Sequence, residues 1–407
     1  MDGVKRKRSG KSNRLRNIAI VDRKKGHRSR RKKGSWSDLP QDILIIILER
    51  LHLVDRIRFR TVCKNWLLAP VHYIQPDKLP WIMNYWFSSD PTICSLSEPS
   101  RKLPYILKDE RAWNLLSHAI VCASRFGWVL LAKRVCKIVD VTFYYVYNPL
   151  TKEIISLPGL KWQRGQRNKY FWENQATFSS VPTSPDCVFI VPHICKREEI
   201  FISTYSNGDT TWKTRNVTPP RPYFFPNYHM AYMKGTFYCY SAVGALSSFN
   251  AATQDWRMLT ERHWRNCWEW TLAGGMSYFF AYSGDLYLVQ LTELNVDMPD
   301  CNIYRFDWLD VAWKKVKSLE GGAIFLGKFS FGVSAGEQTK KVANRVYFFC
   351  PRTSLPRFLI YGSTEKRPAD MGEKSESQDS IYYVTPAGMG GSVRIWMEPP
   401  LLTPSGG

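Results

Sequence analysis

The sequence predicts a small all-α helical module at residues 35–76, followed by a large all-β domain at residues 77–400. Three observations support this division. An apolar helix pattern occupies residues 36–66, short strand-like segments separated by turns fill most of the remainder, and residues 1–34 are dominated by Lys and Arg. With 407 residues and 44% hydrophobic content, the chain is long enough to bury a sizeable core, which excludes a wholly disordered protein.

Residues 1–34 form a basic segment that is predicted to be disordered. They contain fifteen Lys or Arg and two Asp, so they supply +13 of the formal net charge of +22. Two basic clusters have the spacing of a nuclear import signal read by an importin, which predicts a nuclear location with the cytoplasm as a second compartment. A nucleic-acid-binding arm and a solvated tail without a function remain alternatives. The residues of the predicted import signal are Lys5, Arg6, Lys7, Arg8, Arg30, Arg31, Lys32 and Lys33.

The first helix of the module is predicted to begin at Leu39-Pro40. Pro40 suits the first turn of a helix, where its missing N–H costs nothing, and Ser37 or Asp38 is available to cap nearby amides. Apolar residues then recur at helical spacing, and a second short helix from about Asp55 adds more of them. Because a module of roughly 40 residues buries too little of its own surface to hide them all, we expect another subunit to cover part of this surface.

At these residues the chain resembles an F-box, through the Leu39-Pro40 opening, the apolar pairs of the first helix and the closing segment 62–66. The resemblance implies docking onto a Skp-family adaptor, which couples the module to a cullin-based ubiquitin ligase, while the rest of the chain selects a protein substrate. An ordinary helical hairpin that packs against its own downstream domain is the alternative. The adaptor-facing residues that the resemblance implies, some of which must instead form the internal core, are Leu39, Pro40, Ile43, Leu44, Ile47, Leu48, Leu51, Val62, Cys63 and Trp66.

The β domain is predicted from a loose repeat of strand, polar turn and second strand that often carries Trp. The turn anchors Asn148, Asn207, Asn250 and Asp307 lie 59, 43 and 57 residues apart. That spacing fits one four-stranded blade per repeat, so the sequence predicts a β-propeller of five to seven blades rather than a sandwich. Aromatic strands entered through small or polar turns are expected at 127–131, 235–239, 284–288 and 344–349.

The second half of the chain resembles the kelch-related propellers that follow the F-box in many plant proteins. The resemblance rests on residues 147–151 and on the closing 381–384 with Trp396. The double glycine of kelch repeats occurs at Gly274-Gly275, which leaves the blade number and register open. The polar stretch 363–380 is expected to be a long mobile insertion between strands.

Catalysis has little support in the sequence. Residues 332–336 match the G-x-S-x-G string, but a hydrolase triad would need a later His, and the last histidine is His263. We therefore interpret the string as a Gly-rich loop.

The ten cysteines are interpreted as reduced and mostly buried, and His193 with Cys195 lacks a second pair to complete a zinc site. We expect a non-catalytic adaptor without metal or cofactor.

The leading functional hypothesis is the substrate-recognition subunit of an SCF-type (Skp-cullin-F-box) ubiquitin ligase. The alternative is a nuclear nucleic-acid-associated propeller with an incidental F-box-like hairpin, whose affinity would fall steeply with salt. An F-box protein that acts outside ligases has the same sequence features. The charged N-terminus and the short aliphatic run at 43–48 predict neither a signal peptide nor a membrane span, so we expect an intracellular protein without membrane partners.

Overall fold

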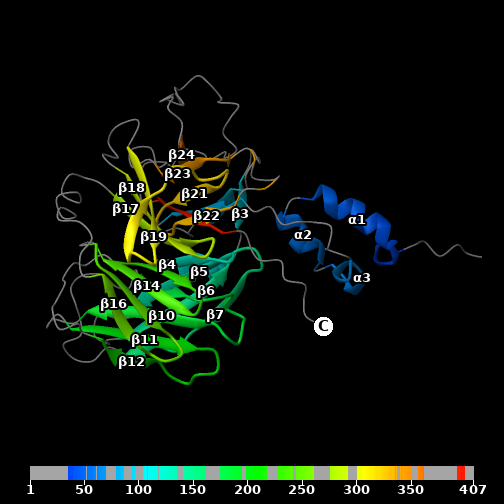
Figure 1. Cartoon of the computed structure of the whole chain (residues 1–407). Helices are drawn as coiled ribbons and strands as arrows, with labels where there is room; N and C mark the ends of the chain where they lie inside the picture. Colours follow the sequence, from blue (N-terminus) through cyan, green and yellow to red (C-terminus); the bar gives the residue numbers. More distant parts are fainter. Residues whose placement is uncertain are drawn as a thin grey trace, which may run out of the picture.

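The computed structural model shows a small group of helices and a ring of β sheets. In Figure 1 the helices α1, α2 and α3 stand apart from the sheets. The sequence-based fold class, a small helical F-box region followed by an all-β propeller domain, is confirmed. The described residues are 35–51, 53–60, 62–69, 79–86, 94–97, 104–107, 109–117, 119–134, 141–161, 175–194, 199–217, 228–241, 244–260, 276–291, 300–334, 336, 340, 342–349, 356–361 and 392–398.

The helical module consists of the 3-10 helix η1 (Trp36–Asp38) and helices α1 (Gln41–Arg50), α2 (Leu53–Arg60) and α3 (Lys64–Leu67). Helix α1 begins directly after the predicted opening Leu39-Pro40, and the predicted capping of a nearby amide by Asp38 is present, although in η1 rather than in α1. Pro40 is itself the N-cap of α1 and supplies no side-chain bond. Ser37 and Asp38 belong instead to η1, where the Asp38 carboxylate accepts a hydrogen bond from the Ser35 N–H at 3.4 Å.

Among the described residues the β domain forms six sheets, five of four strands and one of five, arranged as the blades of a propeller. The predicted range of five to seven blades therefore resolves to six. The first three blades contain β25 (Ser392–Met397), β1 (Trp81–Trp86), β2 (Cys94–Ser97) and β3 (Tyr105–Leu107) in blade 1, β4 (Ile120–Arg125), β5 (Trp128–Arg134), β6 (Val141–Asn148), β7 (Glu153–Ser156) and β8 (Leu160–Lys161) in blade 2, and β9 (Thr177–Phe178), β10 (Val188–Ile194), β11 (Ile200–Ser206) and β12 (Lys213–Asn216) in blade 3.

Pairing within the blades is antiparallel except between β21 and β23 of blade 6, which are parallel because the short β22 doubles back to the inner edge. The other three blades contain β13 (Tyr228–Met233), β14 (Thr236–Ser241), β15 (Leu246–Asn250) and β16 (Trp256–Thr260) in blade 4, β17 (Met276–Tyr282), β18 (Asp285–Leu291), β19 (Cys301–Asp307) and β20 (Ala312–Lys315) in blade 5, and β22 (Phe331–Val333), β21 (Ala323–Leu326), β23 (Arg345–Phe349) and β24 (Pro356–Ile360) in blade 6.

Two kinds of turn recur from blade to blade. In blades 2, 4 and 5 the first two strands are joined by two residues that both have positive φ, the second of them Gly, as the right-handed twist of a tight hairpin requires. The four predicted turn anchors all lie where the third strand of a blade ends: Asn148, Asn250 and Asp307 are the last residues of β6, β15 and β19, and Asn207 directly follows β11. At Asn148, Asn250 and Asp307 the side-chain oxygen accepts hydrogen bonds of 2.9–3.2 Å from the N–H groups two and three residues later. The loose repeat in the sequence therefore corresponds to a turn structure that recurs from blade to blade.

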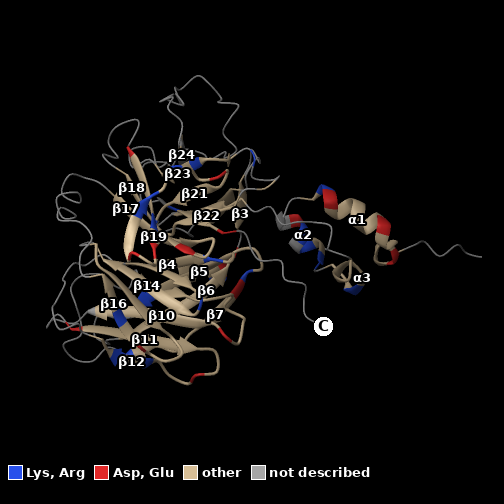
Figure 2. Ribbon diagram, in the orientation of Figure 1, with Lys and Arg blue, Asp and Glu red and all other residues tan. Residues whose placement is uncertain are grey.

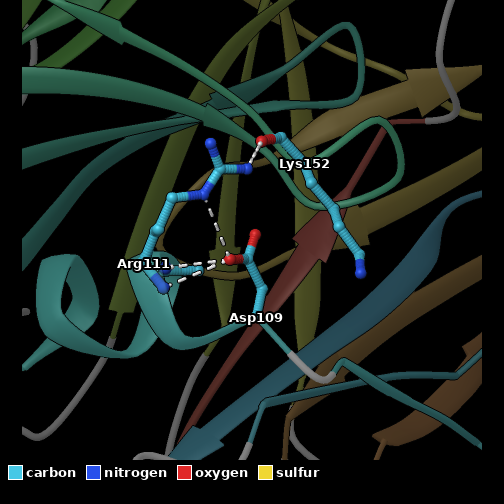
Figure 3. Close-up of polar contacts among 4 residues, drawn as sticks. Asp109, Arg111 and Lys152 are labelled. Atoms are coloured by element: carbon cyan, nitrogen blue, oxygen red, sulfur yellow. Dashed lines mark hydrogen bonds and ion pairs between the residues drawn. The ribbon is translucent and has the colours of Figure 1, made fainter.

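A short helix that the sequence analysis did not predict, α4 (Glu110–Leu116), packs into the core shared by blades 1 and 2. Its N-cap is Asp109, whose Oδ1 accepts hydrogen bonds from the N–H groups of Arg111 and Ala112 at 3.2 and 3.5 Å. The Arg111 guanidinium lies 3.7 Å from the same carboxylate and donates a hydrogen bond to the Lys152 carbonyl at 3.4 Å (Figure 3). Arg111 thus ties the start of α4 to the β6–β7 turn.

The G-x-S-x-G string lies at the inner edge of blade 6. Gly332 and Val333 belong to strand β22, so the interpretation of 332–336 as a Gly-rich loop is wrong for these two residues. A Cβ at Gly332 would lie 2.5 Å from the Tyr282 ring, which explains a glycine there by close approach of two strands rather than by catalysis. The predicted double glycine 274–275, the insertion 363–380 and the closing 381–384 lie outside the described residues.

Candidate functional site

Helix α1 carries apolar side chains on two faces. Leu44 and Leu48 are 0% and 2% exposed, whereas Ile43 and Ile46 are 39% and 46% exposed. Residues three or four apart share one face of a helix, so the first pair and the second pair form two separate stripes. One stripe fills the core of the module and the other remains open to solvent. Figure 2 shows the middle of α1 as an uncharged stretch between charged ends.

The core of the module is small. Within the described part of the chain it consists of Leu44, Leu48, Phe59 and Ala69, all drawn from the module itself, with half-buried apolar residues around them. The rings of Phe59 and Trp66 stack with centroids 4.3 Å apart, which joins α2 to α3. A core of this size leaves little reserve of stability, because few apolar side chains are removed from water.

Asn65 and Trp66 hold the ends of the module together. The Asn65 side-chain amide donates hydrogen bonds to the carbonyls of Ser37 and Leu39 at 2.9 and 3.1 Å, and its oxygen accepts one from Gln41 Nε2 at 3.1 Å. The Trp66 indole N–H donates to the Trp36 carbonyl at 3.0 Å. These bonds fix α3 against η1 and the start of α1, so the module has a defined surface rather than three loosely connected helices.

The module has a dense set of solvent-exposed apolar side chains. It supplies six of the eleven exposed large hydrophobic residues found among the described residues, although it is a minor part of the chain. Trp36 is the most exposed of them, at 77%, followed by Leu68 at 74% and Val62 at 58%. We call the six residues the exposed apolar set; they are Trp36, Ile43, Ile46, Val62, Leu67 and Leu68. Exposed apolar side chains concentrated in this way mark an interaction surface.

The ten residues predicted to face the adaptor divide into three groups. Pro40, Ile43 and Val62 are exposed, Leu44 and Leu48 are buried in the core, and Leu39, Ile47, Leu51, Cys63 and Trp66 are half-buried. The prediction did not include Trp36, Ile46, Leu67 and Leu68. Of these four, only Ile46 gave a signal in the sequence, because it widens the apolar stripe of α1. The residues of the predicted import signal lie outside the described residues.

The described part of the propeller offers no activated nucleophile and no cluster of metal ligands. Burial raises the pKa of the Cys239 and Cys301 thiols to about 12, so both are protonated at neutral pH and react poorly. Burial lowers the pKa of His193 to about 4. No group of three or more His, Cys, Asp or Glu that could hold a metal ion occurs among the described residues.

None of the described helices is long and apolar enough to cross a membrane.

Comparison with known proteins matches both parts of the chain. The family model of the KIB1-4 beta-propeller matches residues 95–382, and that of the F-box domain matches residues 36–68. The F-box/kelch-repeat protein At1g57790 of Arabidopsis thaliana is 24% identical over 376 residues, which are 90% of this chain and 96% of the relative.

Two further relatives from Arabidopsis thaliana are also F-box proteins. At1g49360 is 26% identical over 380 residues, covering 89% of this chain and 72% of the relative, and At4g00893 is 32% identical over 251 residues, covering 58% and 57%. The propeller model alone spans more than half of the chain, and an F-box domain precedes it. The chain therefore belongs to the plant-type F-box proteins that carry a KIB1-4 β-propeller.

Proposed function

We propose that this protein is the substrate-recognition subunit of an SCF-type ubiquitin ligase. In this role the helical module binds a Skp-family adaptor and, through it, a cullin, while the propeller binds a protein substrate. F-box proteins generally serve as such subunits. The observation that carries the proposal is the exposed apolar set, which is open to solvent among the described residues.

The physical reason for adaptor binding is the apolar area that the module leaves in water. Removing apolar surface from water is favourable by about 25 cal/mol per Å², so a subunit that covers Ile43, Ile46 and Val62 gains free energy that the module cannot gain by itself. The hydrogen bonds of Asn65 and Trp66 fix the surface before binding, which lowers the entropic cost of association.

No catalytic side chain of this protein is needed for the proposed role. Holding a substrate and the ubiquitin-loading enzyme in one assembly raises the effective concentration of the substrate lysines. The protonated state of the buried thiols Cys239 and Cys301 is consistent with a non-catalytic protein. F-box proteins with propeller domains are typically non-catalytic adaptors.

The proposal is tested by co-purification of the Skp-family adaptor and cullin with the full chain. Ile43→Asp and Val62→Asp place a charge in the exposed apolar set without touching the module core, so both should reduce adaptor recovery at least tenfold, or by about 1.4 kcal/mol. Ile106→Asp is the matched control, because Ile106 is equally exposed on the propeller, at 53%. Undiminished adaptor recovery by both module variants would refute the proposal.

Nuclear import is proposed on the sequence of residues 1–34 alone. The two basic clusters match the spacing that an importin reads. Replacing Arg30, Arg31, Lys32 and Lys33 by Ala in a fluorescent fusion of the full chain should shift the protein from nucleus to cytoplasm. If localisation is unchanged while retention on DNA or RNA falls steeply with salt and is lost with residues 1–34, the nucleic-acid-binding alternative is favoured.

A further inference from the structure

A central channel runs through the propeller where the inner edges of the blades meet. The strands β25, β4, β9, β13, β17 and β22 each stand at one end of their sheet. Contacts of β25 with β4, of β4 with β9, of β13 with β17 and of β17 with β22 place these ends at the centre of the ring. Residues from or adjoining all six strands line one cavity of about 90 Å³. A cavity of this volume holds a few water molecules or a small anion such as phosphate or acetate. The unpaired edges supply backbone N–H and C=O groups to its wall.

Three charged side chains line this cavity among the described residues: Arg125, Lys328 and Glu398. Arg125 and Glu398 both contact Phe126. The Arg125 guanidinium carbon is 4.9 Å from the centre of the Phe126 ring, and the Glu398 carboxylate accepts a hydrogen bond from the Phe126 N–H at 3.0 Å. Both charged groups therefore lie beside Phe126.

Lys328 forms no ion pair with an acidic side chain in the described part of the chain, although Glu398 lines the same cavity. It lies in the loop between β21 and β22, and its ammonium group donates a hydrogen bond to the carbonyl of Val121 in β4. An ammonium group carries three donors, so two remain for a ligand. The side chain is open to the channel, while the surrounding blades displace much of the bulk water and lower the pKa of Lys328. A cation in such surroundings favours an anionic partner.

Neutral polar groups complete the lining. Desolvation lowers the pKa of His229 to about 4, so its imidazole is uncharged at neutral pH and adds no further positive charge to those of Arg125 and Lys328. The Ser124 hydroxyl and the Gln175 side-chain oxygen are buried at the channel wall without a hydrogen-bond partner among the described residues. Ser124 is 1% exposed, and a buried polar group of this kind is satisfied only by a water or a ligand.

We propose that the central channel is a binding site for a small anionic molecule, with Lys328 supplying the ammonium group that holds its carboxylate or phosphate. The position of Lys328 gives such binding a structural consequence. Lys328 lies in blade 6 and its ammonium group donates to β4 of blade 2, so this side chain joins blades that are separated by blade 1, and an anion bound to the ammonium group would hold it in place. A bound anion should thus stabilise the closed ring. The inference does not depend on adaptor binding or on ligase assembly.

The first test measures how fast an N-hydroxysuccinimide ester modifies Lys328 in the full-length wild-type chain, read by mass spectrometry of its peptides. Inorganic phosphate and acetate, at matched ionic strength against chloride, are the two probes. The bound anion should slow modification of Lys328 roughly tenfold at about ten times its dissociation constant. Lys315, which is exposed on β20, is the internal control and should be unaffected.

The two probes separate the two ligand chemistries. Saturable protection by phosphate alone assigns a phosphate-bearing ligand, and protection by acetate alone assigns a carboxylate. Equal modification rates of Lys328 with chloride, phosphate and acetate would overturn the proposal, as would parallel slowing of Lys328 and Lys315.

A second test uses thermal unfolding of variants. The anion that protects Lys328 should raise the Tm of the wild-type chain and of Lys315→Gln in a saturable way, and should leave the Tm of Lys328→Gln unchanged. A Tm increase of equal size in Lys328→Gln would exclude Lys328 as the anchor. If Lys328→Gln does not fold, the labelling of the wild-type chain still decides the question.

Discussion

Ile82 of β1 lies directly opposite Trp396 of β25 in an antiparallel pair. Blade 1 is therefore built from strands near both ends of the described chain, and this pairing closes the ring. Trp396 also reaches blade 6, because its indole N–H donates a hydrogen bond to the Leu326 carbonyl at 3.0 Å and its ring stacks on Phe349 with centroids 4.6 Å apart. One side chain thus connects the first and last blades.

Replacing Trp396 by Ala should destabilise the propeller strongly. Trp396 is 1% exposed, and truncation of a buried aromatic side chain costs about 3–5 kcal/mol. The measurement is the free energy of unfolding of the full chain in a denaturant titration followed by tryptophan fluorescence. Trp308→Ala is the matched control, because Trp308 is 41% exposed and its loss should cost much less. Equal losses in the two variants would contradict the role of Trp396 in ring closure.

Leu44 and Ile43 are neighbours in α1 with opposite predicted roles. Leu44→Ala should destabilise the module by about 2–5 kcal/mol, because it leaves a cavity in a core of very few residues. Hydrogen exchange of the α1 amides should then accelerate, and adaptor binding should fall as a consequence of unfolding. Ile43→Asp should reduce adaptor binding at least tenfold while the α1 amides remain protected. If Leu44→Ala binds the adaptor normally, the assignment of Leu44 to the structural core is wrong.

Asn65 offers a sharper test of how the module is held together. Asn65→Asp keeps an acceptor for Gln41 but removes the donor to the Ser37 and Leu39 carbonyls, and sets a negative charge beside them. Asn65→Asp should therefore destabilise the module at least as much as Asn65→Ala, by about 1–3 kcal/mol. Hydrogen exchange of the α1 and α3 amides at neutral pH measures the effect. A fully stable Asn65→Asp would show that only the bond from Gln41 matters.

The repetitive part of the fold was predictable because each blade repeats the same local chemistry. Asn148, Asn250 and Asp307 occupy equivalent turns. In each turn a side-chain oxygen accepts a hydrogen bond from the N–H two residues later, and this requirement is local, so the residue type alone indicates it in the sequence. Blades 1 and 6 were not identified as units for the opposite reason. Blade 1 combines β25 with β1, which lie far apart in the sequence. In blade 6, β22 pairs with the edge of β21 that is nearer the channel. Neither pairing can be predicted from the spacing of turns along the sequence.

The helical module shows the same division between local and non-local information. Periodicity identified the apolar residues of α1 but not which stripe is buried, because that depends on where Phe59 and Trp66 lie. Trp36, Leu67 and Leu68 had no periodic partner to mark them as exposed. The central channel was not predicted either, since Lys328 and Val121 are brought together only when the ring closes.

His193 should make the stability of the propeller sensitive to mild acid. The residue lies in β10 opposite Phe201, stacked on its ring with centroids 5.4 Å apart, and is 4% exposed. Burial lowers the pKa of His193 from 6.5 to about 4. In the unfolded chain the imidazole takes up a proton below about pH 6.5, whereas in the folded chain it does so only below about pH 4. Protons therefore favour the unfolded chain between these two values.

The free energy of unfolding should accordingly be insensitive to His193 above pH 6.5, fall as the pH decreases toward 4, and level off below that value. At 1.36 kcal/mol per pKa unit the full loss is on the order of 3 kcal/mol. His193→Phe removes the titrating group, so its free energy of unfolding should vary less with pH in this window than that of the wild-type chain. Part of the slope should persist, because desolvation also lowers the pKa of His229 to about 4. Identical pH profiles for His193→Phe and the wild-type chain would show that His193 has the same pKa in the folded and the unfolded chain, and would contradict the lowering of its pKa by burial.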